Sequence, residues 1–409
     1  MNIVLEPGAA ALLDELHRAG FGAYAVGGCV RDSLLGLAPH DWDLCTAARP
    51  GQVMELFGED RCIPTGLQHG TVTVKRDGNL YEITTFRTEG RYSDGRHPDS
   101  VAFVPDLRED LARRDFTINA MAYSAEEGLC DPFGGREDLA RGVVRAVGEP
   151  LRRFGEDALR ILRLYRFAAR FGFAIDEATE AAAKQLASHL DCVSAERIEE
   201  ELNKLLAAPQ PGAYLEPEVL AFVLPELPPE ELTKARRRID ALPAGTEQVS
   251  ARWAALLLPL GETGARKALK RLKCSNARID GAVALVRECG EKTPDTLDKC
   301  DLRLQAKRLL GKYDLHTVQQ LTALWTALAP EEKASFDALR AEAEALTAQG
   351  VCCRISQLAV NGRDLMAAGA TPGPGLRRVL EALLEEVVTG RLPNEKTELL
   401  AFAAGFSAS

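Results

Sequence analysis

The stretch Gly27-Gly28-Cys29-Val30-Arg31-Asp32, closely followed by Asp41-Trp42-Asp43-Leu44, decides how the first part of this chain is organised. An apolar, strand-like run at 24–26 ends at the two glycines, which let a backbone come close to a ligand. A short helix is predicted over 30–35, and the free N–H groups at the start of a helix attract anions. Arg31, on its first turn, could meet a triphosphate. The segment therefore predicts a phosphate-binding element.

The pair Asp41 and Asp43 indicates a second component, a site for divalent cations. Side chains alternate along an extended segment, so these two carboxylates are expected to point to one face. Their repulsion is relieved when cations bridge them, which suits nucleotidyl transfer assisted by two Mg²⁺ ions. Glu82, in the strand-like run 80–86, is placed to be a third carboxylate. The alternative is a turn with an incidental, exposed Asp-x-Asp.

The pattern changes along the chain from mixed helix and strand to helix alone. The first 150 residues show one helical run and several strand-like runs separated by turn residues, at 9–19, 24–26, 42–46, 70–75 and 80–86. From about residue 151 apolar residues recur at helical spacing, with breaks at proline and glycine. The predicted fold is an α+β head, a mixed sheet with helices, followed by an all-α remainder.

Composition excludes several classes of protein. The chain has 409 residues, 46% of them hydrophobic and 27% charged, which predicts a globular protein of two to four domains. No apolar run approaches the roughly 20 residues of a membrane span, and the N-terminus lacks a secretory pattern, so we expect a cytoplasmic protein. The ten cysteines form no C-x-x-C pair and are expected to be mostly buried. A net charge of −10 argues mildly against nucleic acid, and the basic clusters taken alone read as solvated helix faces.

Eight segments between residues 22 and 206 together resemble one family, the class II CCA-adding tRNA nucleotidyltransferases, with their relatives the bacterial poly(A) polymerases. They are Gly27–Asp32, Asp41–Leu44, Thr65–Thr71, Glu82–Arg87, Glu109–Ala120, Asp131–Gly135, Glu156–Arg163 and Glu196–Leu202. The resemblance implies a nucleotidyltransferase head with a palm like that of DNA polymerase β. It is to the shorter bacterial type, because the six histidines do not build the His-Asp metal site of relatives with a phosphohydrolase domain. We therefore expect no phosphatase or phosphodiesterase activity.

The Glu156–Arg163 segment carries the expected choice of nucleotide. Asp157 and Arg160 are three residues apart in a predicted helix, so they are expected to share one face. Cytosine and adenine each present an amino donor beside a ring-nitrogen acceptor, which a carboxylate and a guanidinium can match. Uracil and guanine would leave a buried polar group unpaired. Such a pair can admit CTP and ATP without a template; a simple ion pair is the alternative.

The resemblance also implies roles for other residues. Gly27, Gly28, Arg31, Arg114 and Asp115 would bind ribose and triphosphate, Arg163 and Arg166 would add nucleotide contacts, and Arg91, Asp94 and Arg96 would belong to a flexible loop for A addition. Four domains are expected: a catalytic head (1–148), a neck that reads the base (149–208), and a body (209–350) and tail (351–409) that bind the tRNA acceptor end and elbow.

The predicted function is template-independent addition of C, C and A to tRNA from CTP and ATP, with release of pyrophosphate. A poly(A) polymerase, an enzyme that adds only CC, and a non-catalytic RNA-binding relative are the alternatives. The last of these should have lost carboxylates, whereas Asp41, Asp43 and Glu82 are all present. The expected partners are tRNA, CTP and ATP, without DNA or membrane, and the chain is expected to be a monomer or a homodimer.

Overall fold

A computed structural model describes residues 3–90, 101–291 and 301–406. The chain divides into two compact units, which are described separately here. The first comprises Met1–Pro229 with Arg271–Lys273, and the second comprises Glu230–Lys270 with Cys274–Ser409.

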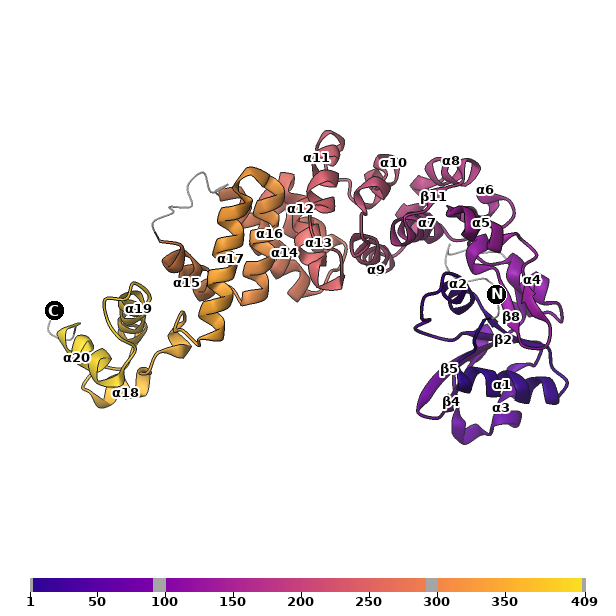
Figure 1. Ribbon diagram of the computed structural model, residues 1–409, viewed down its shortest axis with the longest axis horizontal. Helices are drawn as coiled ribbons and strands as arrows, with labels where there is room; N and C mark the ends of the chain where they lie inside the picture. The colour runs from indigo at the N-terminus through magenta and orange to yellow at the C-terminus, as the bar shows by residue number, and fades with distance from the viewer. Residues whose placement is uncertain (1–2, 91–100, 292–300, 407–409) are drawn as a thin grey trace. The chain divides into compact units, whose positions relative to one another are not determined.

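The first unit begins with a seven-stranded mixed sheet, in the order β3-β4-β5-β2-β1-β8-β9. Figure 1 labels its strands β2, β4, β5 and β8. Strands β2 and β5 are parallel, whereas the other neighbours in this sheet are antiparallel. The strands are β1 Ala23–Val26, β2 Leu44–Thr46, β3 Cys62–Gly66, β4 Thr71–Arg76, β5 Asn79–Thr85, β8 Ala122–Ser124 and β9 Gly128–Cys130. The predicted α+β head with a mixed sheet is confirmed.

The β4–β5 hairpin shows why this part of the sheet forms. Its two-residue turn places Asp77 at φ 49° and Gly78 at φ 83°, both positive, as the tight turn that matches strand twist requires. Asp and Gly accept this conformation readily. Buried and exposed positions alternate along the hairpin, with Val72, Val74, Tyr81 and Ile83 facing the core.

Five helices accompany the sheet: α1 Pro7–Arg18, α2 Gly28–Leu34, α3 Pro50–Phe57, α4 Leu107–Ala112 and α5 Gly135–Arg141. Two small strand pairs lie outside it, β6 Arg87–Glu89 with β7 Val101–Phe103, and β10 Val143–Val144 with β11 Ala174–Ile175. β11 lies in the region predicted to be helical only, and that prediction was wrong there. A two-residue strand is too short to show a period of its own.

The rest of the first unit is mainly helical, and the described residues of the second unit form helices and no strands. The first unit continues with α6 Pro150–Glu156, α7 Leu159–Phe171, α8 Glu177–Gln185, α9 Ala195–Leu206 and α10 Pro217–Val223. The helices that follow are α11 Pro229–Asp240, α12 Val249–Leu257, α13 Gly261–Arg271, α14 Asn276–Glu291, α15 Leu302–Lys312, α16 Leu315–Leu328, α17 Lys333–Ala348, α18 Gly362–Ala367, α19 Pro374–Val388 and α20 Lys396–Phe406. Short 3-10 helices lie at Glu59–Arg61, Leu67–His69, Thr117–Asn119, Ala187–Cys192, Gly212–Tyr214, Thr246–Gln248, Leu258–Leu260, Pro330–Glu332 and Ile355–Gln357. In the described part of the chain, no helix combines the length and apolarity of a bilayer span.

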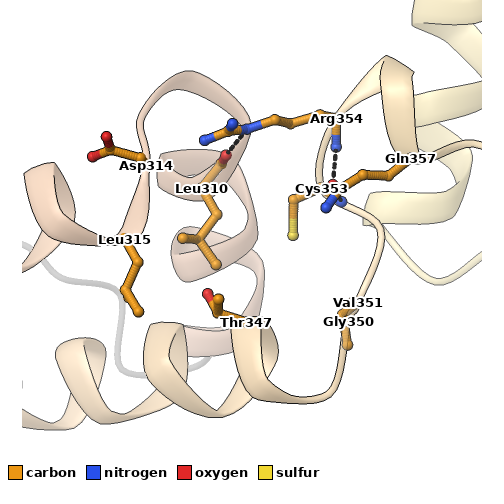
Figure 2. A pocket seen from close by; sticks show the side chains of 9 residues that line it. All are labelled: Leu310, Asp314, Leu315, Thr347, Gly350, Val351, Cys353, Arg354 and Gln357. Carbon is orange, nitrogen blue, oxygen red and sulfur yellow. Dashed lines mark hydrogen bonds between the residues drawn. The ribbon is translucent and has the colours of Figure 1, made fainter.

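A pocket of about 250 Å³ lies in the second unit beside the end of α15 (Figure 2). Arg354 donates from Nε to the Leu310 carbonyl at 2.8 Å and from Nη2 to the Tyr313 carbonyl at 2.6 Å. Asp314 accepts from the backbone N–H of Thr317 at 2.8 Å and caps α16. These charged groups bind helix ends, so the pocket lies within a structural joint. Cys352 and Cys353 beside it are buried, as are most of the described cysteines.

Candidate active site

The glycine turn that precedes α2 is close to an arginine from a distant part of the chain. Gly27 has φ +77°, and a Cβ atom there would lie 2.9 Å from Nη1 of Arg114. The backbone N–H of Gly27 donates to the Met121 carbonyl at 3.0 Å. Glycine is therefore favoured by its backbone conformation, and a side chain at this position would also displace the tip of Arg114. The turn and Arg114, both predicted to face a triphosphate, lie side by side.

The pairing of β2 with β5 brings together two of the three predicted carboxylates, Asp43 and Glu82. The parallel register sets Leu44 opposite Ile83, so Asp43 and Glu82, one residue earlier in each case, are neighbours. Burial raises the pKa of Asp43, Glu82 and Asp41 raise it further, and Arg114 opposes them. The Asp43 side chain nevertheless keeps solvent contact. The strand predicted at 42–46 begins later than expected. β2 begins at Leu44, so Asp41 and Asp43 precede the strand.

Among the described residues, no preformed group of three or more His, Cys, Asp or Glu side chains is arranged to hold a metal ion. The chemistry of the donor set still fits Mg²⁺. Mg²⁺ prefers oxygen ligands, and it is commonly held by one or two carboxylates, waters and substrate phosphates. Burial is the main cause of the raised pKa of Asp43, and Glu82 and Asp41 add to it; a divalent cation would relieve the repulsion among these carboxylates.

Arg114 is the cation that faces these carboxylates. Its Nη2 lies 3.3 Å from Oδ2 of Asp110, a buried carboxylate that also accepts from Nε of Arg113 at 3.0 Å. Desolvation would raise the pKa of Asp110, but Arg114 and Arg113 together lower it. Within the described structure, Nε of Arg114 is buried and has no hydrogen-bond partner. Arg114 therefore carries one buried donor that a ligand can satisfy.

Asp115 and Arg31 are buried and already hydrogen-bonded. Asp115 accepts from Asn119 at 3.0 Å and from Nε and Nη2 of Arg163 at 2.9 and 2.6 Å. Burial alone would raise its pKa, but Arg163 holds it well below the usual range. Arg31 donates to Asp32 at 2.8 Å and to Asn119 at 2.5 Å. A contact between the Arg31 guanidinium and a triphosphate would require these bonds to change, so that role stays a prediction.

The base-reading segment differs from its prediction. α6 ends at Glu156 and α7 begins at Leu159, with Asp157 extended between them (φ −144°, ψ 105°). The expectation that Asp157 and Arg160 share one face of a single helix was therefore wrong. The reason is local: the Asp157 carboxylate accepts from the backbone N–H of Leu159 at 3.1 Å, a bond that competes with helix continuation.

Each member of the predicted pair has a different partner from the one expected. Oδ2 of Asp157 accepts from Nη2 of Arg197 at 2.9 Å. Nη1 of Arg160 donates to Oε2 of Glu156 at 2.9 Å, and the Arg160 side chain is buried. The structure therefore has two ion pairs, Asp157 with Arg197 and Arg160 with Glu156, instead of a simple Asp157–Arg160 pair. Both groups are held in place near the start of α7.

Arg163 and Arg166, predicted to contact nucleotide, also have partners within the fold. Nε of Arg166 lies 2.6 Å from Oε2 of Glu201, and Nη1 of Arg163 lies 3.9 Å from Oε1 of the same residue. Burial lowers the pKa of Arg166 to about 10, against the opposing charge of Glu201. The guanidinium of Arg166 stacks over Phe167 at 3.9 Å. The loop residues Arg91, Asp94 and Arg96 lie outside the described residues.

Comparisons with known proteins show which family the chain belongs to. Residues 23–145 match the model of the poly A polymerase head domain. Residues 172–228 match a probable RNA- and SrmB-binding site of polymerase A, and residues 245–403 match a putative domain 2 of tRNA nucleotidyltransferase. The CCA-adding enzyme of Limosilactobacillus fermentum is 39% identical over 408 residues, spanning 96% of this chain and 95% of that one. The chain belongs to the CCA-adding enzyme family.

Other CCA-adding enzymes extend the similarity. That of Latilactobacillus sakei is 40% identical over 96% of each chain. The crystal structure of the Bacillus stearothermophilus CCA-adding enzyme in complex with CTP is 33% identical and superposes with a TM-score of 0.80, covering 99% of this chain and 98% of that one. As a member of the CCA-adding enzymes the chain is a nucleotidyltransferase, and the predicted fold class and family are confirmed.

Several residues that organise the site were given no role in the sequence analysis. They are Asp110, Asn119, Arg153, Arg197 and Glu201. All are polar residues in segments that otherwise bury apolar side chains, and four of them lie in the quoted family segments. A buried polar residue needs a partner, and that requirement was the available signal.

Proposed function

We propose that this chain adds C, C and A to the 3′ end of tRNA, one nucleotide at a time and without a template, using CTP and ATP and releasing pyrophosphate. The observation that carries the proposal is the β2–β5 register, which puts Asp43 beside Glu82 with Arg114 opposite. Similarity to CCA-adding enzymes over 96% of the chain supports the same reaction.

Asp41 and Asp43 would hold Mg²⁺, with Glu82 as the third carboxylate. When bound, the two cations supply charge neutralisation at the phosphates and a lowered pKa of the attacking 3′-hydroxyl. The residues of the chain itself would position the nucleotide. Arg114, beside Gly27, offers its buried Nε–H and positive charge to the triphosphate, and Asp115 stands one residue further along for the ribose.

Base choice is assigned to Asp157 and Arg160. Each is held by its own partner, Arg197 and Glu156 respectively. A fixed carboxylate accepts from the amino group of cytosine or adenine while a fixed guanidinium donates to the adjacent ring nitrogen. Fixed groups reject uracil and guanine because they cannot turn to satisfy the reversed pattern. Arg163 and Arg166 would add further nucleotide contacts.

The helical remainder is assigned to tRNA, with body and tail contacting the acceptor end and the elbow. Its match to a tRNA nucleotidyltransferase domain over residues 245–403 supports this assignment. The four domain boundaries, a cytoplasmic location, the absence of DNA as partner and a monomeric or homodimeric state belong to the same proposal. The head alone does not separate CCA addition from poly(A) synthesis, because its family model is named for the polymerases.

The test uses tRNA ending at the discriminator base, with CTP and ATP supplied separately and together. We expect two C additions with CTP alone and a complete CCA end with both nucleotides. Asp43→Ala should abolish incorporation while tRNA binding persists, and Asp14→Ala, an exposed substitution in α1, is the matched control. Long tails from ATP alone would instead identify a poly(A) polymerase, and products stopping at CC would identify a partial enzyme.

A further inference from the structure

The carbonyl end of α4 lies directly before the residues proposed to face the ribose and triphosphate. α4 ends at Ala112 with Arg113 as its C-cap, and Arg114 and Asp115 follow. The last carbonyls of a helix lack partners within it and carry its negative partial charge. Here the carbonyls of Ala112 and Arg113 accept from arginine side chains of α6 and α7.

Arg153, in α6, supplies most of these bonds. Its Nη2 donates to the Ala112 carbonyl at 2.7 Å, its Nη1 to the Arg113 carbonyl at 3.1 Å, and its Nε to the Val147 carbonyl at 3.3 Å. The residue is only 7% exposed. A guanidinium presents its donors in a rigid plane, so bonds to three separate carbonyls fix its orientation.

Arg160, the proposed base-reading arginine, is held by the same arrangement. Its Nη2 donates to the Arg113 carbonyl at 3.2 Å, so this one oxygen accepts from both arginines. Its Nη1 donates to the backbone carbonyl of Arg153 at 3.0 Å. Oε2 of Glu156 lies 2.7 Å from Nη1 of Arg153 and 2.9 Å from Nη1 of Arg160. That carboxylate offsets the repulsion between the two guanidinium groups.

We propose that Arg153 is a positioning residue for nucleotide selection, a role that rests on the proposed function. It acts through Arg160 by setting that guanidinium at a fixed distance from Arg114 and Asp115. A nucleotide whose phosphates and ribose are bound then brings its base edge to a donor already in place. Preorganisation of this kind matters because a misplacement of about 1 Å can cost on the order of 100-fold in rate.

The experiment measures kcat/KM for CTP and for UTP on tRNA ending at the discriminator base. We expect Arg153→Ala to lower the CTP/UTP ratio by roughly 10- to 100-fold, because Arg160 gains freedom to meet the wrong base. Arg152→Ala is the matched control: the neighbouring side chain is 76% exposed and also pairs with Glu156, at 3.2 Å, so the ratio should stay as in the wild type. Arg153→Lys should fall between, since an ammonium cannot bind three carbonyls as the planar group does.

A purely structural residue would lower CTP and UTP incorporation by the same factor, so an unchanged ratio in Arg153→Ala would overturn the proposal. If that variant does not fold, as judged by thermal unfolding, Arg153→Lys decides alone: a fallen ratio supports the role and an unchanged ratio overturns it. Failure of the proposed function is a separate result, because the wild type would then add neither C nor A to this tRNA.

Discussion

Glu201 is the residue whose replacement should most clearly report how α7 and α9 of the first unit are held together. It lies in α9, its side chain is 5% exposed, and it faces Arg166, which is 11% exposed, at 2.6 Å. Glu201→Gln keeps the shape of the side chain but removes its charge. Breaking a buried ion pair while leaving one partner behind costs about 3–5 kcal/mol, because an uncompensated charge remains buried.

The magnitude can be turned into a measurement. A loss of about 3 kcal/mol from a unit of roughly 150–250 residues lowers the melting temperature by about 6–12 °C, at about 2–4 °C for each kcal/mol. Thermal unfolding of the first unit, followed by circular dichroism, would record this shift. The matched control is Glu200→Gln, one residue earlier, whose side chain is 64% exposed and pairs with Lys204 on the surface. Its loss should cost less than about 1 kcal/mol.

The reasoning fails if Glu201→Gln and Glu200→Gln shift the melting temperature equally. That result would mean that Arg166 finds other compensation or is solvated in solution. A second readout is the KM for nucleotides. Because Glu201 also faces Arg163, which binds Asp115, the Gln variant should raise KM for CTP and ATP, whereas the Glu200 variant should not.

Further predictions concern the turn, a carboxyl pair, the second unit and the cation. Gly27→Ala should raise KM for nucleotides by displacing Arg114, whereas Gly20→Ala, with a similar positive φ and open space around it, should affect stability alone; equal kinetics would contradict this. Burial, followed by the neighbouring Glu218, raises the pKa of Glu216 from 4.5 to about 6. Between these pH values the folded state therefore binds more protons than the unfolded state, so the free energy of unfolding should rise as the pH falls from 6 to 4.5. Glu216→Gln should remove that rise in urea unfolding titrations. Arg354→Ala should lower the stability of the second unit by about 1–3 kcal/mol, measured by chemical denaturation, because two helix-end carbonyls lose charged donors. Chelation of divalent cations should stop incorporation and added Mg²⁺ should restore it; activity that persists in the chelator would exclude the cation role.

The local features of this chain were readable from the sequence because their causes are local. Asp77-Gly78 predicts a tight turn through the conformations that these residues accept, and the alternation around it predicts strands β4 and β5. The glycine pair at 27 and 28 and the Asp-x-Asp at 41–43 pointed to phosphate and cation chemistry by residue type alone. These inferences need only neighbours within a few positions.

Tertiary structure decided which of these groups act together. Asp43 meets Glu82 because β2 pairs in parallel with β5, and no short-range pattern specifies that pairing. Asp157 binds Arg197, 40 positions away, rather than Arg160, and no short-range pattern specifies that partner. Sequence determined the residue types and most of the elements. Only the fold brought their charges close enough to fix distances and shift pKa values, because electrostatic interaction depends on separation in space and on burial, and neither is a property of position along the chain.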